Sequence, residues 1–278
     1  MHGLHTIIDL HGASGSQNGY DNSGQRTNSP QWALDSANIN ATLAVIQVLA
    51  SELGPNVDAI ELLNEVAGFL GSAWDSAVRQ YWQSGYTVVR QTAGDNVVVV
   101  IGDAFEGVNV RSIPLLGHEP RRYELTRSRE KSWQGFFPNP RNDNVMMDYV
   151  HATISIRHTH FFLIYACLQH EYQIFSTLEL SRSEDEHVQF ACQNTLPMLA
   201  GFAPSNMWTV AGEWTTATTD CALWLNGRGV GARWDGSIGG GAPALGSCEG
   251  LTGQWTTFSN DYIAYMRKYV RQNYFFSK

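Results

Sequence analysis

Short apolar runs in the first hundred residues alternate with longer stretches in which apolar residues recur every three or four positions. The short runs predict strands, and the helical spacing predicts helices. In order, the pattern predicts a strand at Thr6–Leu10, a helix at Leu34–Leu53 that Gly54-Pro55 ends, a strand at Val57–Leu63, a helix at about Ala73–Thr92 and a strand at Val97–Ile101. Apolar strands separated by helices of this length predict a parallel sheet covered by helices, an α/β fold.

The second half of the chain continues less regularly. Two strand segments are predicted at Val145–Tyr149 and His170–Phe175, followed by a helix over about Glu184–Ala200 and a strand at Met207–Trp214. Two segments do not fit this order. Residues 110–131 hold six of the chain's 18 Arg and Lys residues without a sustained period, and residues 150–169 separate the two strand segments, which would otherwise form one continuous strand.

Polar residues follow several of the predicted strands. In an eight-stranded α/β barrel the active site lies at the carboxyl ends of the strands, where Asp9-Leu10-His11, Asn64-Glu65 and Gly212-Glu213 would lie. Two carboxylates at different strand ends are what glycoside hydrolysis requires: one protonates the departing oxygen, and the other attacks the anomeric carbon or activates water. Glu65 and Glu213 are therefore the candidates. The competing interpretation is that each is a polar residue that caps the next helix.

Residues 9–26 form a Gly- and Asn-rich loop after the first strand. Sugar sites combine aromatic faces with fixed polar groups, and Tyr20, Asp21 and Asn22 supply both, so this loop is a candidate wall of a sugar site. The alternative is an ordinary turn-rich connection, with His11 as a structural histidine.

Composition narrows the class of protein. Acidic residues outnumber basic ones 26 to 18, the net charge is −8, and no basic stripe is present, so nucleic acid is not an expected partner. The longest apolar run, Phe161–Leu168, is too short to cross a membrane, and the first residues have no secretion-signal pattern. The four cysteines lack metal-site spacing and are consistent with one or two disulfides or with buried thiols. An enzyme or a sugar-binding protein fits best.

Four extended motifs carry a family resemblance. They are DLHGASGSQNGYDNSG (9–24), AIELLNEVAGF (59–69), HEYQIF (170–175) and GEWTTATTDCALWLNGRGVGARWDG (212–236). In this order they resemble the fungal exo-β-1,3-glucanases of glycoside hydrolase family 5. The resemblance implies a (β/α)8 TIM barrel and a retaining enzyme that releases glucose from the non-reducing ends of β-1,3-glucan, without a metal or organic cofactor.

The resemblance also implies roles for individual residues. Glu65 becomes the acid/base and Glu213 the nucleophile, and in a retaining pair the carboxyl groups lie about 5 to 5.5 Å apart. Asn64 would bind the sugar 2-hydroxyl, and Tyr172 would orient the nucleophile. The remaining positions are His11 and His170 around the reacting centre, Tyr20 and Phe175 as an aromatic pair at the pocket entrance, Asp21 and Asn22 on sugar hydroxyls, and Cys221 with Cys248 as a disulfide. Cys192 would pair with a cysteine that this chain lacks.

Other properties follow from the same resemblance. The substrate would be a β-glucan polysaccharide or oligosaccharide, and the protein a monomer outside the cell or in the cell wall. Asn40-Ala41-Thr42 has the acceptor pattern for N-glycosylation. Two alternatives stay open: an inactive carbohydrate-binding fragment and an endo-acting family 5 glucanase.

The chain also departs from the family pattern. Val66 stands where the family usually has Pro, and residues 1–278 are expected to form a single incomplete barrel with strands three to seven present and strands one, two and eight missing. Residues 110–131 and 150–169 are expected to be poorly packed insertions, and residues 270–278 an atypical tail. Val110, Val150 and Val270 begin these segments, and valine codons begin with GT, as introns do, so we interpret the segments as translated introns. Little activity is expected from a barrel with open edges.

Overall fold

The computed structural model describes residues 5–105, 133, 135–140, 143–149, 151–155, 165–170, 172–190, 193 and 207–250. They divide into two compact units, the first within residues 1–149 and 198–209 and the second within residues 150–197 and 210–278. Residues 110–131 and 270–278 lie outside the described residues, as do Leu115 and residues 161–164, whose packing was expected to be poor.

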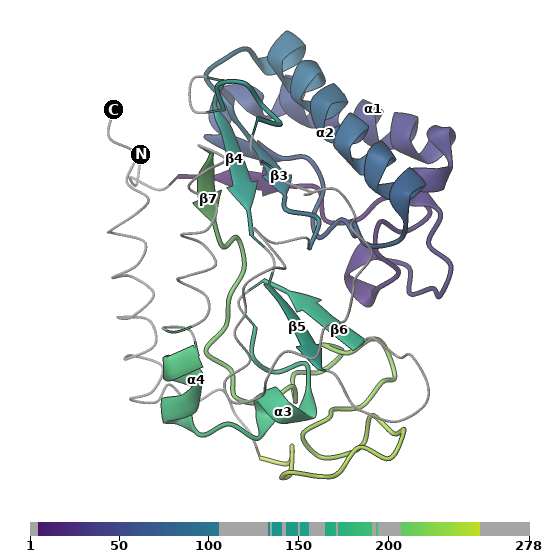
Figure 1. The fold of residues 1–278 in the computed structure, drawn as a ribbon, viewed down its shortest axis with the longest axis vertical. Coiled ribbons are helices and arrows are strands. Elements are labelled where there is room, and N and C mark those ends of the chain that lie inside the picture. Colours follow the sequence, from purple (N-terminus) through teal and green to yellow (C-terminus); the bar gives the residue numbers. More distant parts are fainter. Residues whose placement is uncertain are drawn as a thin grey trace, which may run out of the picture. The chain divides into compact units, whose positions relative to one another are not determined.

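The first unit is built on a sheet of five strands (Figure 1). In sheet order these are β1 (Ile7–Asp9), β2 (Ala59–Glu61), β3 (Val98–Gly102), β4 (Val145–Asp148) and β7 (Trp208–Val210). The first four pair in parallel, with Ile7 opposite Ala59 and Val99 opposite Val145. Every residue of β2, β3 and β4 is buried, which explains why their sequences show no polar alternation. The predicted α/β class is confirmed.

Two long helices belong to the same unit and lie side by side in Figure 1. Helix α1 (Ser36–Glu52) begins after Asp35, whose side chain accepts a hydrogen bond from the Ala37 backbone N–H at 2.9 Å. Helix α2 (Ser72–Ala93) ends at Gly94, which has φ +81°. Three short 3-10 helices accompany them: η1 (Asp21–Ser23), η2 (Trp32–Leu34) and η3 (Gly54–Asn56).

Aromatic side chains join these helices to the core. The Trp32 and Tyr81 rings meet edge to face with centroids 5.0 Å apart, and Tyr81 also contacts Trp82. Val78, Trp82 and Val89 of α2 are buried as their spacing predicts. The predicted helix Leu34–Leu53 is one residue too long at its end, because α1 ends at Glu52 and Leu53 lies beyond it with its side chain exposed.

The second unit holds a separate two-stranded sheet. Strands β5 (His151–Ser155) and β6 (Tyr165–Gln169) pair antiparallel, with His151 opposite Gln169. These strands fall inside the segment 150–169 and pair with each other rather than with the five-stranded sheet. The expected insertion is therefore a hairpin at the backbone level.

The prediction of a strand at His170–Phe175 was wrong. The Tyr172 N–H donates to the His170 carbonyl at 2.9 Å, and the Phe175 N–H donates to the Glu179 carboxylate at 3.1 Å. These donors form a turn and a side-chain bond instead of a strand ladder. The strand predicted at Met207–Trp214 is also shorter, since β7 covers only Trp208–Val210.

Two short helices follow this segment, α3 (Thr177–Leu180) and α4 (Glu184–Phe190). Ser183 accepts from the Glu186 N–H at 3.3 Å, and Glu186 accepts from the Ser183 N–H at 2.7 Å, which is a capping box. The side chain of Ser176 accepts from the Glu179 N–H at 3.1 Å and caps α3. The predicted helix start at Glu184 is confirmed, while residues 191–192 and 194–200 of that prediction lie outside the described residues.

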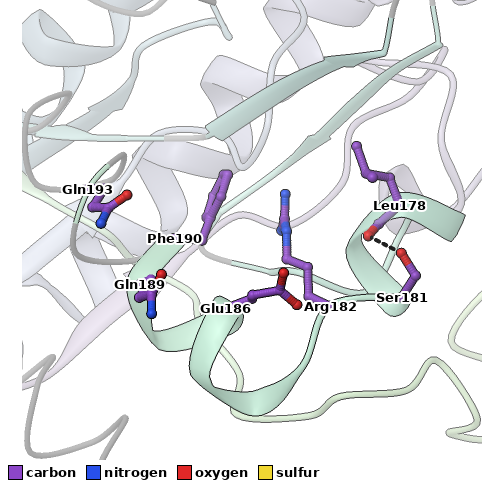
Figure 2. A pocket seen from close by; sticks show the side chains of 7 residues that line it. All are labelled: Leu178, Ser181, Arg182, Glu186, Gln189, Phe190 and Gln193. Carbon is purple, nitrogen blue, oxygen red and sulfur yellow. Dashed lines mark hydrogen bonds between the residues drawn. The ribbon is translucent and has the colours of Figure 1, made fainter. Parts of the chain in front are cut away.

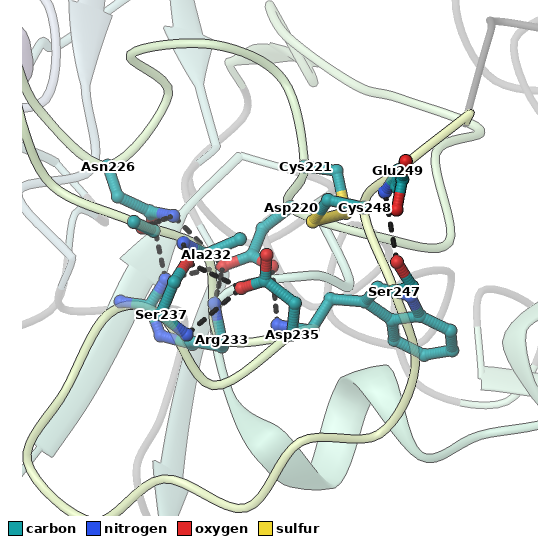
Figure 3. The surroundings of a disulfide bond; sticks show 12 residues. Asp220, Cys221, Asn226, Ala232, Arg233, Asp235, Ser237, Ser247, Cys248 and Glu249 are labelled. Carbon is teal, nitrogen blue, oxygen red and sulfur yellow. Dashed lines mark hydrogen bonds and ion pairs between the residues drawn. A yellow bond between two sulfur atoms is a disulfide. The ribbon is translucent and has the colours of Figure 1, made fainter.

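The loop after β7 is organised around a buried carboxylate (Figure 3). Asp220 accepts hydrogen bonds from the Asn226 side chain at 2.9 Å and from the backbone N–H groups of Arg233 at 2.8 Å and Trp234 at 2.9 Å. Next to it, Cys221 and Cys248 form a disulfide. Since this loop has no strand ladder, the carboxylate and the disulfide hold its shape.

Candidate active site

The first group of site residues lies in the first unit, just after β2. Asn64 and Glu65 are 1% and 4% exposed, and Glu65 has φ +46°, an uncommon value for a residue with a side chain. The preceding Leu62 carbonyl accepts the Tyr81 hydroxyl at 2.7 Å, and the Asn64 N–H donates to the Leu10 carbonyl at 3.0 Å. Helix α2 and the end of β1 thereby fix the backbone that carries Glu65.

The Gly- and Asn-rich loop after β1 closes over this position. Asn22 donates its amide N–H to the Glu65 carboxylate, and Asn18 donates to the Glu65 carbonyl at 2.9 Å and to the Asn22 side chain at 3.1 Å. Gln17 is buried and donates to the carbonyls of His11 and Asn64, each at 3.0 Å. The structure thus brings the predicted residues Asn22, Asn64 and Glu65 together.

Sequence reasoning missed Gln17 and Asn18. Both are polar residues in a loop whose composition predicts exposure, yet both are buried against the backbone beyond β2. The one signal for them is the length of the loop, because a long polar loop on a sheet must find partners for its own polar groups.

The other predicted residues of this loop have different contacts. The ring Nδ1 of His11 lies 2.7 Å from an oxygen of Asp9, and Asp21 pairs with Arg26 at 3.3 Å. The Tyr20 side chain is exposed.

Asn64 has an incomplete set of hydrogen bonds. Its side-chain nitrogen is buried and has no hydrogen-bond partner among the described residues. A buried amide donor without an acceptor costs about 1–3 kcal/mol. Such a group is expected where a ligand oxygen completes the set.

The second group of site residues lies in the second unit around Glu213. The Tyr172 hydroxyl donates to Glu213 Oε2 at 2.9 Å, and Nδ1 of the buried His170 lies 3.4 Å from the same oxygen. The Glu213 side chain remains 32% exposed. Two donor-bearing side chains therefore hold one carboxylate oxygen while part of the carboxylate faces outward.

Phe175 adjoins this group. Its ring meets the Tyr172 ring edge to face with centroids 5.7 Å apart, and the Arg233 guanidinium lies 5.8 Å from its centroid. The predicted residues His170, Tyr172, Phe175 and Glu213 are thus together in this unit, although the segment that carries three of them is not a strand.

Comparison with known proteins gives the family. The model for "Cellulase (glycosyl hydrolase family 5)" matches residues 1–220, most of the chain. The chain belongs to glycosyl hydrolase family 5. The (β/α)8 barrel of this family accounts for the parallel sheet and its two long helices, which are part of such a barrel. Among the described residues, no helix has both the length and the apolarity to span a membrane.

Individual family 5 relatives come from fungi. A "Glucan 1,3-beta-glucosidase" of Lachancea kluyveri is 36% identical over 96% of this chain and 52% of its own length. One of Blumeria graminis is 37% identical over 89% of this chain and 47% of its own length. A "Glucan 1,3-beta-glucosidase 2" of Wickerhamomyces anomalus is 34% identical over 95% of this chain and 52% of its own length. The chain spans about half the length of these relatives.

Proposed function

We propose that this chain carries the catalytic residues of a retaining glycoside hydrolase that releases glucose from the non-reducing ends of β-1,3-glucan by double displacement. Glu213 is the nucleophile and Glu65 the acid/base. The observation that carries the proposal is the Tyr172 hydroxyl on Glu213 Oε2 at 2.9 Å, because it holds a partly exposed carboxylate in its charged, attacking form. Family 5 membership and the names of the relatives supply the substrate class.

The chain connection supports the pairing of Glu65 with Glu213. Thr209 of β7 belongs to the first unit, and Glu213 follows four residues later. Glu213 therefore follows the carboxyl end of β7 in the sequence. Glu65 lies beyond the carboxyl end of β2 in the same sheet. Catalytic residues of barrel enzymes come from different strand ends of this kind.

In the first step Glu65 donates a proton to the glycosidic oxygen while Glu213 attacks the anomeric carbon. The glycosidic C–O bond breaks, the shortened glucan leaves as an alcohol, and glucose is held as an ester of Glu213. In the second step Glu65, now ionised, takes a proton from water, which attacks the same carbon and releases Glu213. The configuration at this carbon is retained because it is inverted twice.

The remaining predicted residues bind the sugar in this proposal. The Asn64 amide, which lacks a protein acceptor among the described residues, donates to the 2-hydroxyl. His11 and His170 border the reacting carbon, Asp21 and Asn22 bind hydroxyls, and Tyr20 and Phe175 flank the pocket. The substrate is a β-glucan polysaccharide or oligosaccharide, and the chain acts as a monomer outside the cell or in the cell wall.

Release of glucose from β-1,3-linked oligosaccharides by the purified chain tests the proposal. Glucose is expected as the sole early product, and Glu213→Gln is expected to lower its rate by about 10³-fold or more while the fold is kept. Early release of longer oligosaccharides would instead indicate endo action. Binding of glucan without release, unchanged in Glu213→Gln, would show a binding fragment and overturn the catalytic proposal.

Azide separates the roles of the two carboxylates. Azide is a small anion that can occupy the space left by a shortened carboxylate. In Glu213→Gly it attacks the anomeric carbon once and gives an inverted glucosyl azide, whereas in Glu65→Ala it displaces the ester and gives a retained one. The same product from both variants would contradict the assignment.

A further inference from the structure

The segment that carries Tyr172 receives little support from regular structure. Residues 172–174 belong to no helix or strand, so their backbone donors and acceptors do not form a ladder. Yet the Tyr172 hydroxyl must keep one direction to remain 2.9 Å from Glu213 Oε2. Another contact therefore has to fix this segment.

Gln173, the next residue, supplies that contact. Its side chain is only 4% exposed, and its Nε2 donates to the His187 carbonyl at 3.0 Å. Its Oε1 accepts from the Arg182 guanidinium at 3.1 Å and lies 3.0 Å from His187 Nδ1. One buried amide thus makes three hydrogen bonds to α4 and to the residue two positions before it.

The partners of Gln173 are themselves fixed. The Arg182 guanidinium lies 4.0 Å from the centroid of the Phe190 ring, and Figure 2 shows these two side chains next to each other. The Ser183–Glu186 capping box sets where α4 begins, and the His187 N–H donates to the Ser183 carbonyl at 3.0 Å. The amide is therefore attached to a structured element.

The bonds also define the state of His187. Because Gln173 Oε1 is an acceptor, His187 Nδ1 must carry a hydrogen. Burial lowers the pKa of His187 to about 4, and the nearby Arg182 adds to this effect, whereas Glu186 opposes it. At neutral pH the imidazole is uncharged and keeps Nδ1–H as the donor.

We propose that Gln173 is a positioning residue: its bonds to His187 and Arg182 hold the neighbouring Tyr172 so that the phenol donates to Glu213. The proposal rests on the proposed role of Glu213 as nucleophile. Nothing requires Gln173 to touch the substrate. Its effect passes through the backbone between residues 172 and 173, and helix α4 becomes part of the catalytic apparatus without contributing a group to the reaction.

The test replaces Gln173 by Met, which keeps the length of the side chain and removes all three hydrogen bonds. A single hydrogen bond to a charged group corresponds to about 10- to 100-fold in rate, so Tyr172→Phe is expected to lower kcat by that factor. Gln173→Met is expected to lower kcat by about 3- to 30-fold. KM for the oligosaccharide should change by less than about twofold in both. Gln189→Met, the same change on an exposed position of α4, is the matched control and should have no effect.

A double variant separates positioning from a general loss of stability. If Gln173 acts through Tyr172, adding Gln173→Met to Tyr172→Phe lowers kcat no further, and both single variants move the acidic limb of the pH profile of kcat/KM to higher pH. The proposal would be overturned if the effects of the two changes on kcat multiply in the double variant. It would also be overturned if Gln173→Met lowers the melting temperature while the pH profile of kcat/KM stays the same.

A structural measurement works without turnover. In crystal structures, the distance from the Tyr172 hydroxyl to Glu213 Oε2 should lengthen beyond hydrogen-bond range in Gln173→Met and stay near 2.9 Å in Gln189→Met. An unchanged distance in Gln173→Met would refute the proposal even if the chain releases no glucose. If Gln173→Met does not fold, His187→Asn, which keeps a donor near the position of Nδ1, should retain more of the contact than His187→Leu.

Discussion

At the scale of single residues, the two glutamates have different surroundings. Glu65 is buried under the loop after β1, where Asn22 donates to its carboxylate. Glu213 is partly exposed and accepts from Tyr172. An acid/base must exchange its proton with the leaving group and then with water, whereas a nucleophile must stay ionised and open to attack. The donor from Tyr172 suits Glu213 to the second role.

The buried His187 predicts a dependence of stability on pH. Its pKa lies near 4 in the folded protein, against 6.5 for an exposed histidine, because burial disfavours the charged form. The unfolded chain therefore binds more protons between these values, and stability that is complete above pH 6.5 is lost as the pH falls towards 4. The melting temperature of the chain should fall in this window.

The variant His187→Asn isolates this contribution. It removes the titrating group, so its melting temperature should decline less between pH 6.5 and 4 than that of the unchanged chain. Gln189→Asn should follow the unchanged chain, since Gln189 is exposed and does not titrate. Parallel profiles for the unchanged chain and His187→Asn would show that the histidine contributes nothing.

At the scale of elements, side-chain caps set where three of the helices, α1, α3 and α4, begin. Asp35 caps α1, Ser176 caps α3 by accepting from the Glu179 N–H, and the Ser183–Glu186 capping box sets the start of α4. The two short helices are too short to be stable alone, so their caps and packing must hold them. The second group of site residues, around Glu213, depends on these caps.

The variant Asp35→Ala tests the role of the side-chain cap at α1. Removal of an N-cap side chain costs about 1 kcal/mol, so the midpoint of urea unfolding should shift to lower concentration with an unchanged slope. Gln47→Ala changes an exposed residue inside the same helix and should not lower stability, because alanine is the better helix former. Equal destabilisation by both changes would contradict the capping role.

At the scale of the whole molecule, we propose that residues 1–278 form a single incomplete glycosidase barrel and that residues 150–169 are an insertion in it. The hairpin of β5 and β6 supports this, because His151 and Gln169 are direct partners. The Cα atoms of such partners lie about 4.5–5.5 Å apart, close to the 3.8 Å between consecutive residues. The first and last strand residues of the segment therefore lie close together, as is typical of an insertion that leaves and rejoins the chain at one place.

A chain without residues 150–169 is expected to stay folded, with an unchanged or higher melting temperature and with glucose release retained or increased. Removal of residues 72–91, an equally long part of α2 with buried Trp74 and Trp82, should abolish folding. Loss of folding in the first variant would show that the hairpin is integral. Sequencing the spliced transcript tests the separate interpretation of 110–131, 150–169 and 270–278 as translated introns.

The sequence alone determined the α/β class and most elements of the first unit. Buried parallel strands and amphipathic helices are periodic in the chain, so Val98–Gly102 and Ser72–Ala93 agree with their predictions within one or two residues. The motifs also marked the polar residues that follow the strands, among them Asn64 and Glu65.

Only the tertiary structure decided how the site residues are held. The segment His170–Phe175 has a strand-like pattern, but its donors find a turn and Glu179 instead, because contacts with residues outside the segment outweigh local propensity. Gln17, Asn18 and Gln173 each have a hydrogen-bond partner at least 9 positions away, among them Glu65 and Arg182. No local pattern encodes partners at such separations, which is why the sequence indicated a Gly- and Asn-rich loop at residues 9–26 and a strand at His170–Phe175 but not the buried hydrogen bonds of these side chains.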